Sequence, residues 1–524
     1  MLAPTLRDAA RWAAPQGEVV LGVRMVTIKY DNQGDAISRD VPRDALALID
    51  AGGNGSERRY TYDDIFRLSG AVARGLLKRG LERGDRVAIL SANRAEFLLT
   101  FLGTMQAGMV SVPVNYKLPA ETVAYVVQDC DAKLVIGDDV RLPLAPDSVP
   151  KISFDSDFAA FLDEGPFTPV KMRPEEPAMF LYTSGSTGRP KGVVLSHYSH
   201  LWAISQRVRR PVPQGQRSLV AAPLYHMNGL AMCQTTLHQG DTIVLLPQFT
   251  TKGYIEAAAK HRVAFLTSVP TMIAMLLRER ELLAKNDLSA VEAVRMGSAP
   301  ITQSLIDQVR AAFPKAAISN GYGTTEAGPV VFGPHPKGIP QPELSTGYPH
   351  PEVELRLVRD GRVVDDEGAL EMKCGALMTH YHKLPEATAK AMTPDGYYRT
   401  SDVFRRDENG FFYFVGRVDD MFVCGGENIY PGEVEKMLER HPGIHQAAVI
   451  PVPDELKGHK PIAFVVKAPG AELDEQAVKT YALANAPAYQ HPRRVLFVEE
   501  MPLAGTNKID KRVLAKQIPP GGDI

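Results

Sequence analysis

Residues 181–192 read LYTSGSTGRPKG, a short strand-like run that passes into a loop rich in glycine and hydroxyl side chains. Glycine lets the backbone approach a ligand closely, and backbone amides, hydroxyls and Lys191 can all donate to phosphate oxygens. The loop differs from a Walker P-loop, because Gly192 follows Lys191 where that motif has a serine or threonine. The stretch therefore predicts a phosphate-binding loop at the end of a β-strand, with a flexible surface loop as the alternative.

Helix-like and strand-like segments alternate on both sides of this loop. Apolar residues recur at helical spacing over the expected helices, and short β-rich runs bounded by turn residues mark the expected strands. Strands are expected at 87–90, 110–114, 129–137, 178–182, 218–221, 242–246 and 264–267, and helices at 62–81, 97–105, 254–261 and 270–283. Residues 142–177 lack strong periodicity and are expected to form a surface connection. The alternation predicts an α/β fold built in layers.

The pattern changes after about residue 345 and again near residues 417–420. Between these points, short β-like runs at 352–359, 369–373 and 411–415 indicate a smaller β-rich section. Beyond them, helices are expected at 431–441, 474–485 and 509–516, and strands at 447–452, 462–467 and 495–498. The expected architecture is a large N-terminal domain, 1–418, of layered α/β subdomains plus a β-rich subdomain, followed by a small α+β C-terminal domain, 419–524.

Composition places the chain among ordinary globular proteins. Of its 524 residues, 44% are hydrophobic and 23% charged, and 59 basic against 61 acidic side chains leave a formal net charge of −2. This balance offers no basic surface for nucleic acid, so no nucleic-acid partner is expected. Polar residues interrupt both the N-terminal stretch and residues 219–237, so neither an export signal nor a membrane span is expected.

The sequence does not predict a transition-metal site. The four cysteines show no CxxC spacing, which argues against a disulfide framework or a cysteine zinc site and favours a reducing, cytoplasmic location. His380 and His382 have no carboxylate or cysteine partner at metal-ligand spacing, and they are expected on a strand face.

Five further blocks follow the glycine-rich loop in order. They are MGSAP at 296–300, NGYGTTEAG at 320–328, YRTSDV at 398–403, GRVDDMFVCGGENIYPGEVE at 416–435 and GTNKIDK at 505–511. With them the chain resembles the adenylate-forming superfamily of acyl-CoA synthetases, luciferases and peptide-synthetase adenylation domains, and within it the chlorobenzoate and coumarate CoA ligases. The resemblance implies that a carboxylate attacks the α-phosphate of ATP to give an acyl-adenylate, and that the thiol of coenzyme A then displaces AMP. Catalysis of this kind rests mainly on positioning and on well-placed cations.

The resemblance assigns most of the named blocks to ATP. Glu326 would hold Mg²⁺, a hard cation that takes oxygen ligands, while Thr325 would bond the α-phosphate and Tyr322 would stack on adenine. Asp402 and Arg417 would bind the ribose hydroxyls. The phosphate-binding residues would be Thr183, Ser184, Gly185, Ser186, Thr187, Gly188 and Lys191, and the adenine slot and its flanking block would comprise Gly297, Ser298, Ala299, Pro300, Asn320, Gly321, Gly323 and Thr324.

The resemblance also assigns roles to the C-terminal part of the chain. Lys508 matches the lysine that reaches the carboxylate and the α-phosphate during adenylation, and Asp419 matches the hinge about which a mobile C-terminal domain turns between the half-reactions. Gly425 and Gly426 would approach the pantetheine arm of CoA. Ser401 stands where glycine is more common, with little expected effect. Lys508 is also a candidate target of a lysine acetyltransferase, and the enzyme is expected to be a monomer or a homodimer.

Residues 222–249 resemble the segment of chlorobenzoate and coumarate ligases in which a histidine acts as an aromatic gate, and the resemblance gives that role to His226. The expected pocket walls are Met227, Asn228, Gly321, Gly328, Pro329 and Val330, with the two glycines leaving room for a ring. The working substrate is an aromatic or arylpropenoic acid of the benzoate, coumarate or ferulate type. A short- or medium-chain aliphatic acid is the rival, because methionine adapts to either shape. Further alternatives are an adenylation enzyme that loads a carrier protein, a luciferase-like oxidative activity and a non-catalytic nucleotide-binding regulator.

Overall fold

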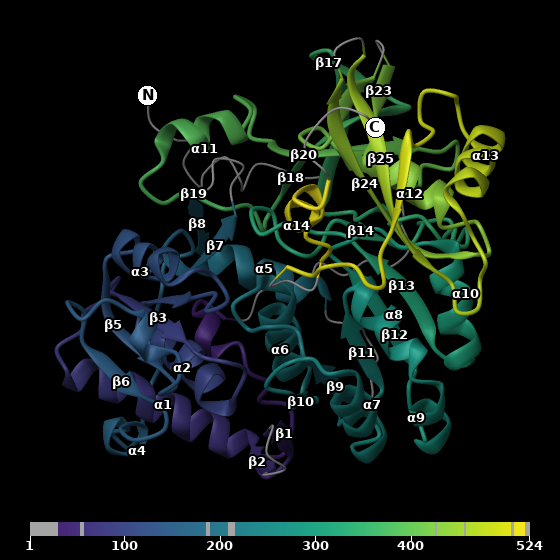
Figure 1. The fold of residues 1–524 in the computed structure, drawn as a ribbon. Coiled ribbons are helices and arrows are strands. Elements are labelled where there is room, and N and C mark those ends of the chain that lie inside the picture. The colour runs from purple at the N-terminus through teal and green to yellow at the C-terminus, as the bar shows by residue number, and fades with distance from the viewer. Residues whose placement is uncertain are drawn as a thin grey trace.

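Two seven-stranded sheets, with helices between and around them, form the larger part of the molecule (Figure 1). The computed structural model describes residues 30–52, 57–184, 189–207, 215–424, 427–454, 457–504 and 508–518. The first sheet has the order β13 (Ala317–Gly321), β12 (Ala293–Gly297), β11 (Phe265–Ser268), β9 (Arg217–Val220), β10 (Thr242–Leu245), β1 (Leu46–Ala51) and β2 (Glu57–Thr61). Neighbouring strands from β13 to β1 are parallel, and β2 pairs antiparallel with β1.

The second sheet carries the glycine-rich loop near one edge. Its order is β19 (His380–Tyr381), β8 (Pro190–Ser196), β7 (Pro177–Ser184), β4 (Val110–Pro113), β3 (Arg86–Leu90), β5 (Ala132–Gly137) and β6 (Lys151–Ser153). Neighbours from β7 to β6 are parallel, whereas β8 and β19 are antiparallel additions at the edge. The residues that flank the loop, Ser184 and Pro190, are therefore register partners at the end of the β7–β8 hairpin.

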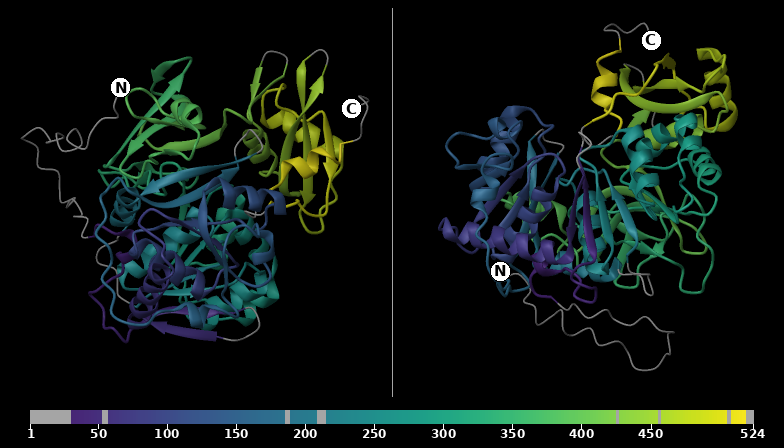
Figure 2. Two further views of the ribbon diagram at one scale, coloured as in Figure 1. Left: turned by 90° about the vertical axis from the view of Figure 1, so that its left-hand side faces the viewer. Right: turned by 90° about the horizontal axis from the view of Figure 1, so that it is seen from below.

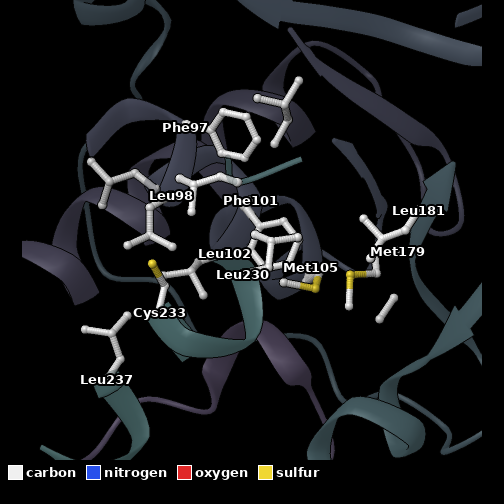
Figure 3. Packing of buried hydrophobic residues seen from close by; sticks show 14 of the residues in the cluster. Phe97, Leu98, Phe101, Leu102, Met105, Met179, Leu181, Leu230, Cys233 and Leu237 are labelled. Carbon is white, nitrogen blue, oxygen red and sulfur yellow. The ribbon is translucent and has the colours of Figure 1, made fainter. Parts of the chain in front are cut away.

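Three helices fill the space between the two sheets with apolar side chains. They are α1 (Tyr62–Lys78), α2 (Ala95–Gln106) and α6 (Met227–Gln239). Phe97 and Phe101 of α2 pack with Leu230 of α6 and Met179 of β7 in one buried cluster (Figure 3). The opposite face of the first sheet is covered by α7 (Thr251–Lys260), α8 (Pro270–Arg278) and α10 (Gln303–Ala312), and the opposite face of the second by α3 (Ala120–Asp129).

Helix α1 shows how local sequence places an element. Thr61 and Asp64 form a capping box, in which the Thr61 hydroxyl accepts from the Asp64 amide and the Asp64 carboxylate accepts from the Thr61 amide. Ile65, Val72 and Leu76 then fall on one face and are fully buried. These signals lie within one stretch of chain, which is why the sequence predicted this helix.

An antiparallel sheet forms the β-rich section, and a smaller unit follows it. The antiparallel sheet has the order β17 (Arg362–Val364), β16 (Val353–Arg359), β18 (Glu367–Cys374), β20 (Tyr398–Arg406) and β21 (Phe412–Arg417). The last sheet has the order β23 (Glu427–Ile429), β22 (Phe422–Cys424), β25 (Gly458–Lys467) and β24 (Ile444–Asp454), with β26 (Arg494–Phe497) beside β25, and it packs with α12 (Pro431–Leu438), α13 (Glu475–Asn485) and α14 (Lys511–Ala515). This yellow C-terminal unit lies at one end of the molecule in both views of Figure 2. The remaining elements are η2 (Gln33–Asp35), η3 (Leu142–Leu144), α4 (Phe158–Phe161), α5 (His197–Arg207), α9 (Arg280–Lys285), α11 (Pro385–Ala391), β14 (Phe332–Gly333) and β15 (Tyr348–Pro349).

Two predictions about secondary structure were wrong. The helix expected at 270–283 is two helices, α8 and α9, because the backbone of Glu279 leaves the helical region at φ −81° and ψ 54°. Residues 142–177 form more than a connection, since they contain η3, the edge strand β6 and the one-turn helix α4. Phe158 and Phe161 of α4 are buried against Phe154, an ordering by tertiary packing that leaves no periodic pattern. Among the helices of the described residues, none is both long and apolar enough to cross a membrane.

His197, the first residue of α5, makes unfolding depend on pH. Its side chain is fully buried, and its Nδ1 accepts a hydrogen bond from the Gln33 amide at 3.0 Å. Burial lowers the pKa of His197 from 6.5 to about 4, so between these values only the unfolded chain takes up the proton.

We therefore expect acid to destabilise the protein below pH 6.5, with His197 contributing up to about 1.4 kcal/mol per pH unit. His197→Asn keeps an acceptor near the Nδ1 position but cannot titrate, so its free energy of unfolding should fall less steeply. Urea unfolding at pH 7.5, 6.5 and 5.5 measures both slopes. Identical slopes for the two proteins would contradict the assignment.

Candidate active site

The two ends of the glycine-rich loop lie side by side. Thr183 near the end of β7 is the register partner of Lys191 on β8. The loop residues Gly185, Ser186, Thr187 and Gly188, together with the Ser184 side chain, lie outside the described residues, as do the CoA candidates Gly425 and Gly426. The hairpin thus brings Lys191 to the position where the predicted phosphate loop begins.

The expected adenine residues follow two neighbouring parallel strands. Gly297 ends β12 and pairs with Gly321, which ends β13, and a Cβ on Gly297 would lie 2.9 Å from the Gly321 carbonyl oxygen. Asn320 precedes Gly321 on β13, and Ser298 follows Gly297 with a left-handed backbone at φ 67°. Carboxyl ends of parallel strands are the usual ligand-binding edge of an α/β sheet. The 297–300 and 320–324 blocks, including Ala299, Pro300, Gly323 and Thr324, therefore meet at such an edge.

Asp402 and Arg417 form a partly buried pair at the edge of the antiparallel sheet. They are register partners on β20 and β21, and Arg417 Nη1 lies 2.9 Å from Asp402 Oδ1. The Asp402 side chain is only 7% exposed, against 44% for Arg417, which distinguishes the pair from an ordinary surface salt bridge. The Tyr322 hydroxyl donates to the second oxygen, Asp402 Oδ2. Burial raises the pKa of Asp402, while Arg417, Tyr322 and Lys508 act in the opposite direction.

Tyr322 is held more tightly than the sequence indicated. Its ring contacts Phe404 edge-on at 4.9 Å and Phe332 at 6.0 Å. Burial raises the pKa of Tyr322 well above its usual value, so its hydroxyl remains a donor to Asp402. The residue expected at adenine is thus also bonded to the residue expected at ribose.

Glu326 and Lys191 converge on one tyrosine that the sequence analysis did not select. The Tyr381 hydroxyl donates to Glu326 Oε1 at 2.9 Å, and Lys191 Nζ lies 5.3 Å from the centre of the Tyr381 ring. Strand alternation offered a signal, because Tyr381 points opposite to His380 and His382. The ring of His382 packs instead on Phe180 at 4.8 Å.

The carboxylate of Glu326 fits a magnesium ion that is shared with phosphate. Tyr381 engages Oε1, and the described residues contain no group of three acidic, histidine or cysteine side chains able to hold a metal on their own. Mg²⁺ commonly uses one or two carboxylates, keeps several waters and takes its remaining oxygens from substrate phosphates. The neighbouring Thr325 lies in the same turn, which the Thr324 amide closes by donating to the Gly328 carbonyl.

His226 is the N-cap residue of α6, and its imidazole carries no charge. Burial lowers the pKa of His226 to about 4, helped by the nearby cations Lys508 and Lys117, so the imidazole is neutral at pH 7. Its ring contacts Tyr225 edge-on at 4.6 Å, and its Nε2 is buried with no hydrogen-bond partner among the described residues. His226 therefore offers a flat, neutral ring with one unused nitrogen.

The two residues after His226 are engaged by other side chains. Met227 Sδ lies 3.2 Å from Nε2 of the buried His200 on α5, and Asn228 Oδ1 accepts weakly from the Thr267 hydroxyl at 3.4 Å. His200 is a further residue that the sequence analysis missed, because only the packing of α5 on α6 reveals it. Pro329 and Val330 continue from the turn that holds Glu326.

Protein atoms lie close to the two glycines that were expected to leave room for a substrate ring. A Cβ on Gly321 would lie 2.8 Å from Arg295 Nε, and one on Gly328 would lie 2.6 Å from the Ala376 Cβ. Gly328 also has φ 76°, which favours glycine. Packing and backbone conformation therefore both favour glycine at position 328, whereas at Gly321 only the movable guanidinium of Arg295 limits the space.

Lys508 joins the C-terminal unit to these residues. Its charge acts on both Asp402 and His226. Lys508 is exposed as a whole residue, yet desolvation of its ammonium group and the charge of Arg417 lower its pKa, while Asp402 acts in the opposite direction. Asp419, in the turn after β21, lies 3.4 Å from Arg417 Nη2. The start of the C-terminal unit thus contacts the ribose pair through Asp419.

Ser401 has a left-handed backbone at φ 60°, although it lies within β20. This is a correction to the expectation of little effect, because such a conformation costs an L-residue about 1 to 2 kcal/mol.

We expect Ser401→Gly to raise the free energy of unfolding by about 0.5 to 1 kcal/mol, since the gain is partly offset by the freedom of glycine in the unfolded chain. Ser401→Ala is the matched control, because it keeps the Cβ and should give no gain. Denaturant titration compares the three proteins. Equal stability of the glycine and alanine variants would contradict the strain.

Comparisons with known proteins place this arrangement in a family. Residues 36–382 match the model of the AMP-binding enzyme family, and residues 433–508 match the AMP-binding enzyme C-terminal domain. The chain belongs to the AMP-binding enzyme family. The predicted resemblance to the adenylate-forming superfamily and the predicted α/β fold class are confirmed, and this AMP-binding enzyme is an AMP-forming ligase.

Several relatives of this AMP-binding enzyme match over most of its length. Feruloyl-CoA synthase of Amycolatopsis sp is 33% identical over 463 residues, 86% of this chain and 92% of that protein. Fatty acid–[acyl-carrier-protein] ligase ScoC of Streptomyces coeruleorubidus is 31% identical over 480 residues, 87% and 91% of the two chains. The structure of ATP-bound MatB from Rhodopseudomonas palustris has a TM-score of 0.83 at 27% identity, covering 93% of this chain and 99% of that one.

Proposed function

We propose that this AMP-binding enzyme is an ATP-dependent acyl-CoA synthetase for an aromatic or arylpropenoic acid of the benzoate, coumarate or ferulate type. The observation that carries the proposal is the way separate ATP blocks meet, since Tyr322 and Arg417 both contact Asp402 while Glu326 and Lys191 both contact Tyr381. Lys508, whose charge acts on Asp402 and His226, is the cation expected where the acid and the α-phosphate meet. The similarity to feruloyl-CoA synthase supports the substrate class.

The first half-reaction brings two negatively charged reactants together. A carboxylate oxygen of the acid bonds to the α-phosphorus, and the bond from that phosphorus to the pyrophosphate oxygen breaks. Lys508 stabilises the charge that develops at the α-phosphate, and Lys191 stabilises the departing pyrophosphate. Glu326 would hold Mg²⁺, which would supply further positive charge at the phosphates. Asp402, Arg417 and Tyr322 fix the nucleoside.

The second half-reaction needs a thiol in place of Lys508. The CoA sulfur bonds to the acyl carbon, and the bond from that carbon to the AMP oxygen breaks. The N-terminal part, 1–418, keeps the adenylate, while the C-terminal part, 419–524, turns about Asp419 to remove Lys508 and bring Gly425 and Gly426 to the pantetheine arm. The enzyme acts in the cytoplasm as a monomer or homodimer, and acetylation of Lys508 would remove the charge that adenylation needs.

The acyl side favours a planar acid. The neutral imidazole of His226 is the ring expected at the carboxylate end, and the buried Tyr225 packs edge-on against it. A short- or medium-chain aliphatic acid is the alternative substrate, because the thioether of Met227 can adapt to a flexible chain.

The test is release of AMP and pyrophosphate with ATP, Mg²⁺ and CoA over benzoate, coumarate, ferulate, butyrate, octanoate and malonate. Highest kcat/KM on an aryl acid supports the proposal, and highest kcat/KM on an aliphatic acid overturns the substrate class. A holo-carrier protein offered in place of CoA tests the second candidate, which the similarity to ScoC favours. Transfer to that carrier but not to CoA would show that the carrier protein is the acceptor. No turnover with any acid would favour a nucleotide-binding regulator.

A further inference from the structure

Tyr381 occupies a short edge strand beside the phosphate hairpin. β19 pairs antiparallel with β8, and Tyr381 is the register partner of Val193, two residues after Lys191. The side chain of Tyr381 is 6% exposed, whereas His380 on the other face of the strand is exposed. A buried tyrosine at a sheet edge is thus directed toward the site.

The hydroxyl and the ring of Tyr381 contact two different charged groups. The hydroxyl donates to Glu326 Oε1 at 2.9 Å, and the ring face lies 5.3 Å from Lys191 Nζ, within the range of a cation–π interaction. The same segment also holds the backbone of Glu326, because the Met378 amide donates to the Glu326 carbonyl at 2.6 Å. Tyr381 therefore lies between the expected metal carboxylate and the expected phosphate cation.

The chemistry of the two groups fixes the direction of the bond between Tyr381 and Glu326. A carboxylate can only accept, so the Tyr381 hydroxyl is the donor to Glu326 Oε1. Tyr398 on β20, itself buried, is near enough to Tyr381 to act on its pKa. A carboxylate that receives such a bond through one oxygen has its second oxygen oriented, and this fixes the direction from which a cation can approach.

We propose that Tyr381 is a positioning residue that aligns Glu326 for Mg²⁺ through its hydroxyl and holds Lys191 at the pyrophosphate through its ring. The inference rests on the proposed function, which supplies the roles of Glu326 and Lys191. The hydroxyl and the ring of Tyr381 then have separate effects. Removing the hydroxyl weakens metal binding, and removing the ring in addition weakens binding of the polyphosphate.

The experiment compares Tyr381→Phe, which keeps the ring, with Tyr381→Leu, which removes both parts. Binding of Mn²⁺ to the full-length enzyme with α,β-methylene-ATP is followed by the electron paramagnetic resonance signal of free Mn²⁺. Binding of the analogue without metal is followed by calorimetry in EDTA. Tyr397→Phe is the matched control, because its hydroxyl donates to Glu354 on the exposed part of the antiparallel sheet.

We expect Tyr381→Phe to raise the Mn²⁺ dissociation constant about tenfold, as for loss of one hydrogen bond to a charged group. Its kcat should recover at saturating Mn²⁺, and its metal-free binding of the analogue should stay unchanged. Tyr381→Leu should in addition weaken metal-free binding about threefold, as for loss of a partly exposed cation–π contact. Tyr398→Phe should raise the Mn²⁺ constant less than Tyr381→Phe, which gives a second variant if the leucine variant does not fold.

Unchanged Mn²⁺ affinity in Tyr381→Phe would overturn the inference, and so would a loss of kcat that saturating Mn²⁺ does not restore. Failure of the proposed function is a separate result. It would appear in the wild-type enzyme as no binding of Mn²⁺ with the analogue and no AMP release with any acid.

Discussion

Lys508→Ala is expected to slow formation of the acyl-adenylate several hundred-fold or more, while conversion of a supplied acyl-adenylate to the thioester stays within about twofold of wild type. A unit charge near 4 Å from the α-phosphate contributes roughly 4 kcal/mol at an effective dielectric of about 20. If this interaction helps only the transition state, its loss lowers the rate by about three powers of ten before desolvation is counted.

Local backbone bonds hold the segment that carries Lys508. The Ala504 amide donates to the Lys508 carbonyl at 2.7 Å, and Leu503 and Ile509 form a β-bridge around it. Lys508 is exposed as a whole residue, but desolvation of its ammonium group lowers its pKa, and its charge acts on Asp402 and His226.

Pyrophosphate release without CoA measures the first half-reaction, and thioester formation from purified acyl-adenylate measures the second. Lys516→Ala is the matched control, because Lys516 lies at the exposed end of α14 in the same segment. Equal loss of both half-reactions in Lys508→Ala would show that the lysine supports the fold or the binding of adenylate rather than the first step.

Elements defined by local signals were predictable from the sequence. Helix α1 carries its capping box and its apolar stripe within seventeen residues, and the strand β3 follows it as expected. The split between α8 and α9 was not predictable, because the residues around Glu279 keep helical spacing while one backbone angle departs. Elements ordered by distant partners, such as α4 against Phe154, likewise leave no local pattern.

Some site residues could likewise be found from local sequence, and others only from contacts between distant segments. Glu326, Asp402 and Lys508 stand in blocks that the sequence resemblance identifies one at a time. Tyr381 and His200 make their contacts between separate elements, so these contacts can be seen only in the three-dimensional structure. The backbone of Ser401 and the packing around Gly321 are also three-dimensional facts, and both differ from what the residue types suggested.

Asp402→Asn is expected to lower kcat/KM for ATP about 30- to 150-fold, mostly through KM. Removing one partner of a buried charged pair costs 3 to 5 kcal/mol, and the 44% exposure of Arg417 reduces this to roughly 2 to 3 kcal/mol, because water can solvate the guanidinium left behind. Asparagine keeps the shape and one acceptor oxygen but removes the charge. The KM for the acid should change less than twofold, because in the proposed site the pair binds the ribose and not the acid.

Tyr322 determines whether Asp402 acts alone or as part of a unit. Its hydroxyl donates to Asp402 Oδ2, so Tyr322→Phe should lower kcat/KM for ATP about tenfold by freeing that oxygen. The double variant should lose less than the product of the two single losses, because asparagine has already weakened the bond that phenylalanine removes. Steady-state kinetics over ATP and acid concentrations are measured for the wild type, the two single variants and the double variant, which together make up a double-mutant cycle. Fully multiplicative losses would mean that Tyr322 and Asp402 contact the nucleotide independently, and that their hydrogen bond does not position the carboxylate for ribose.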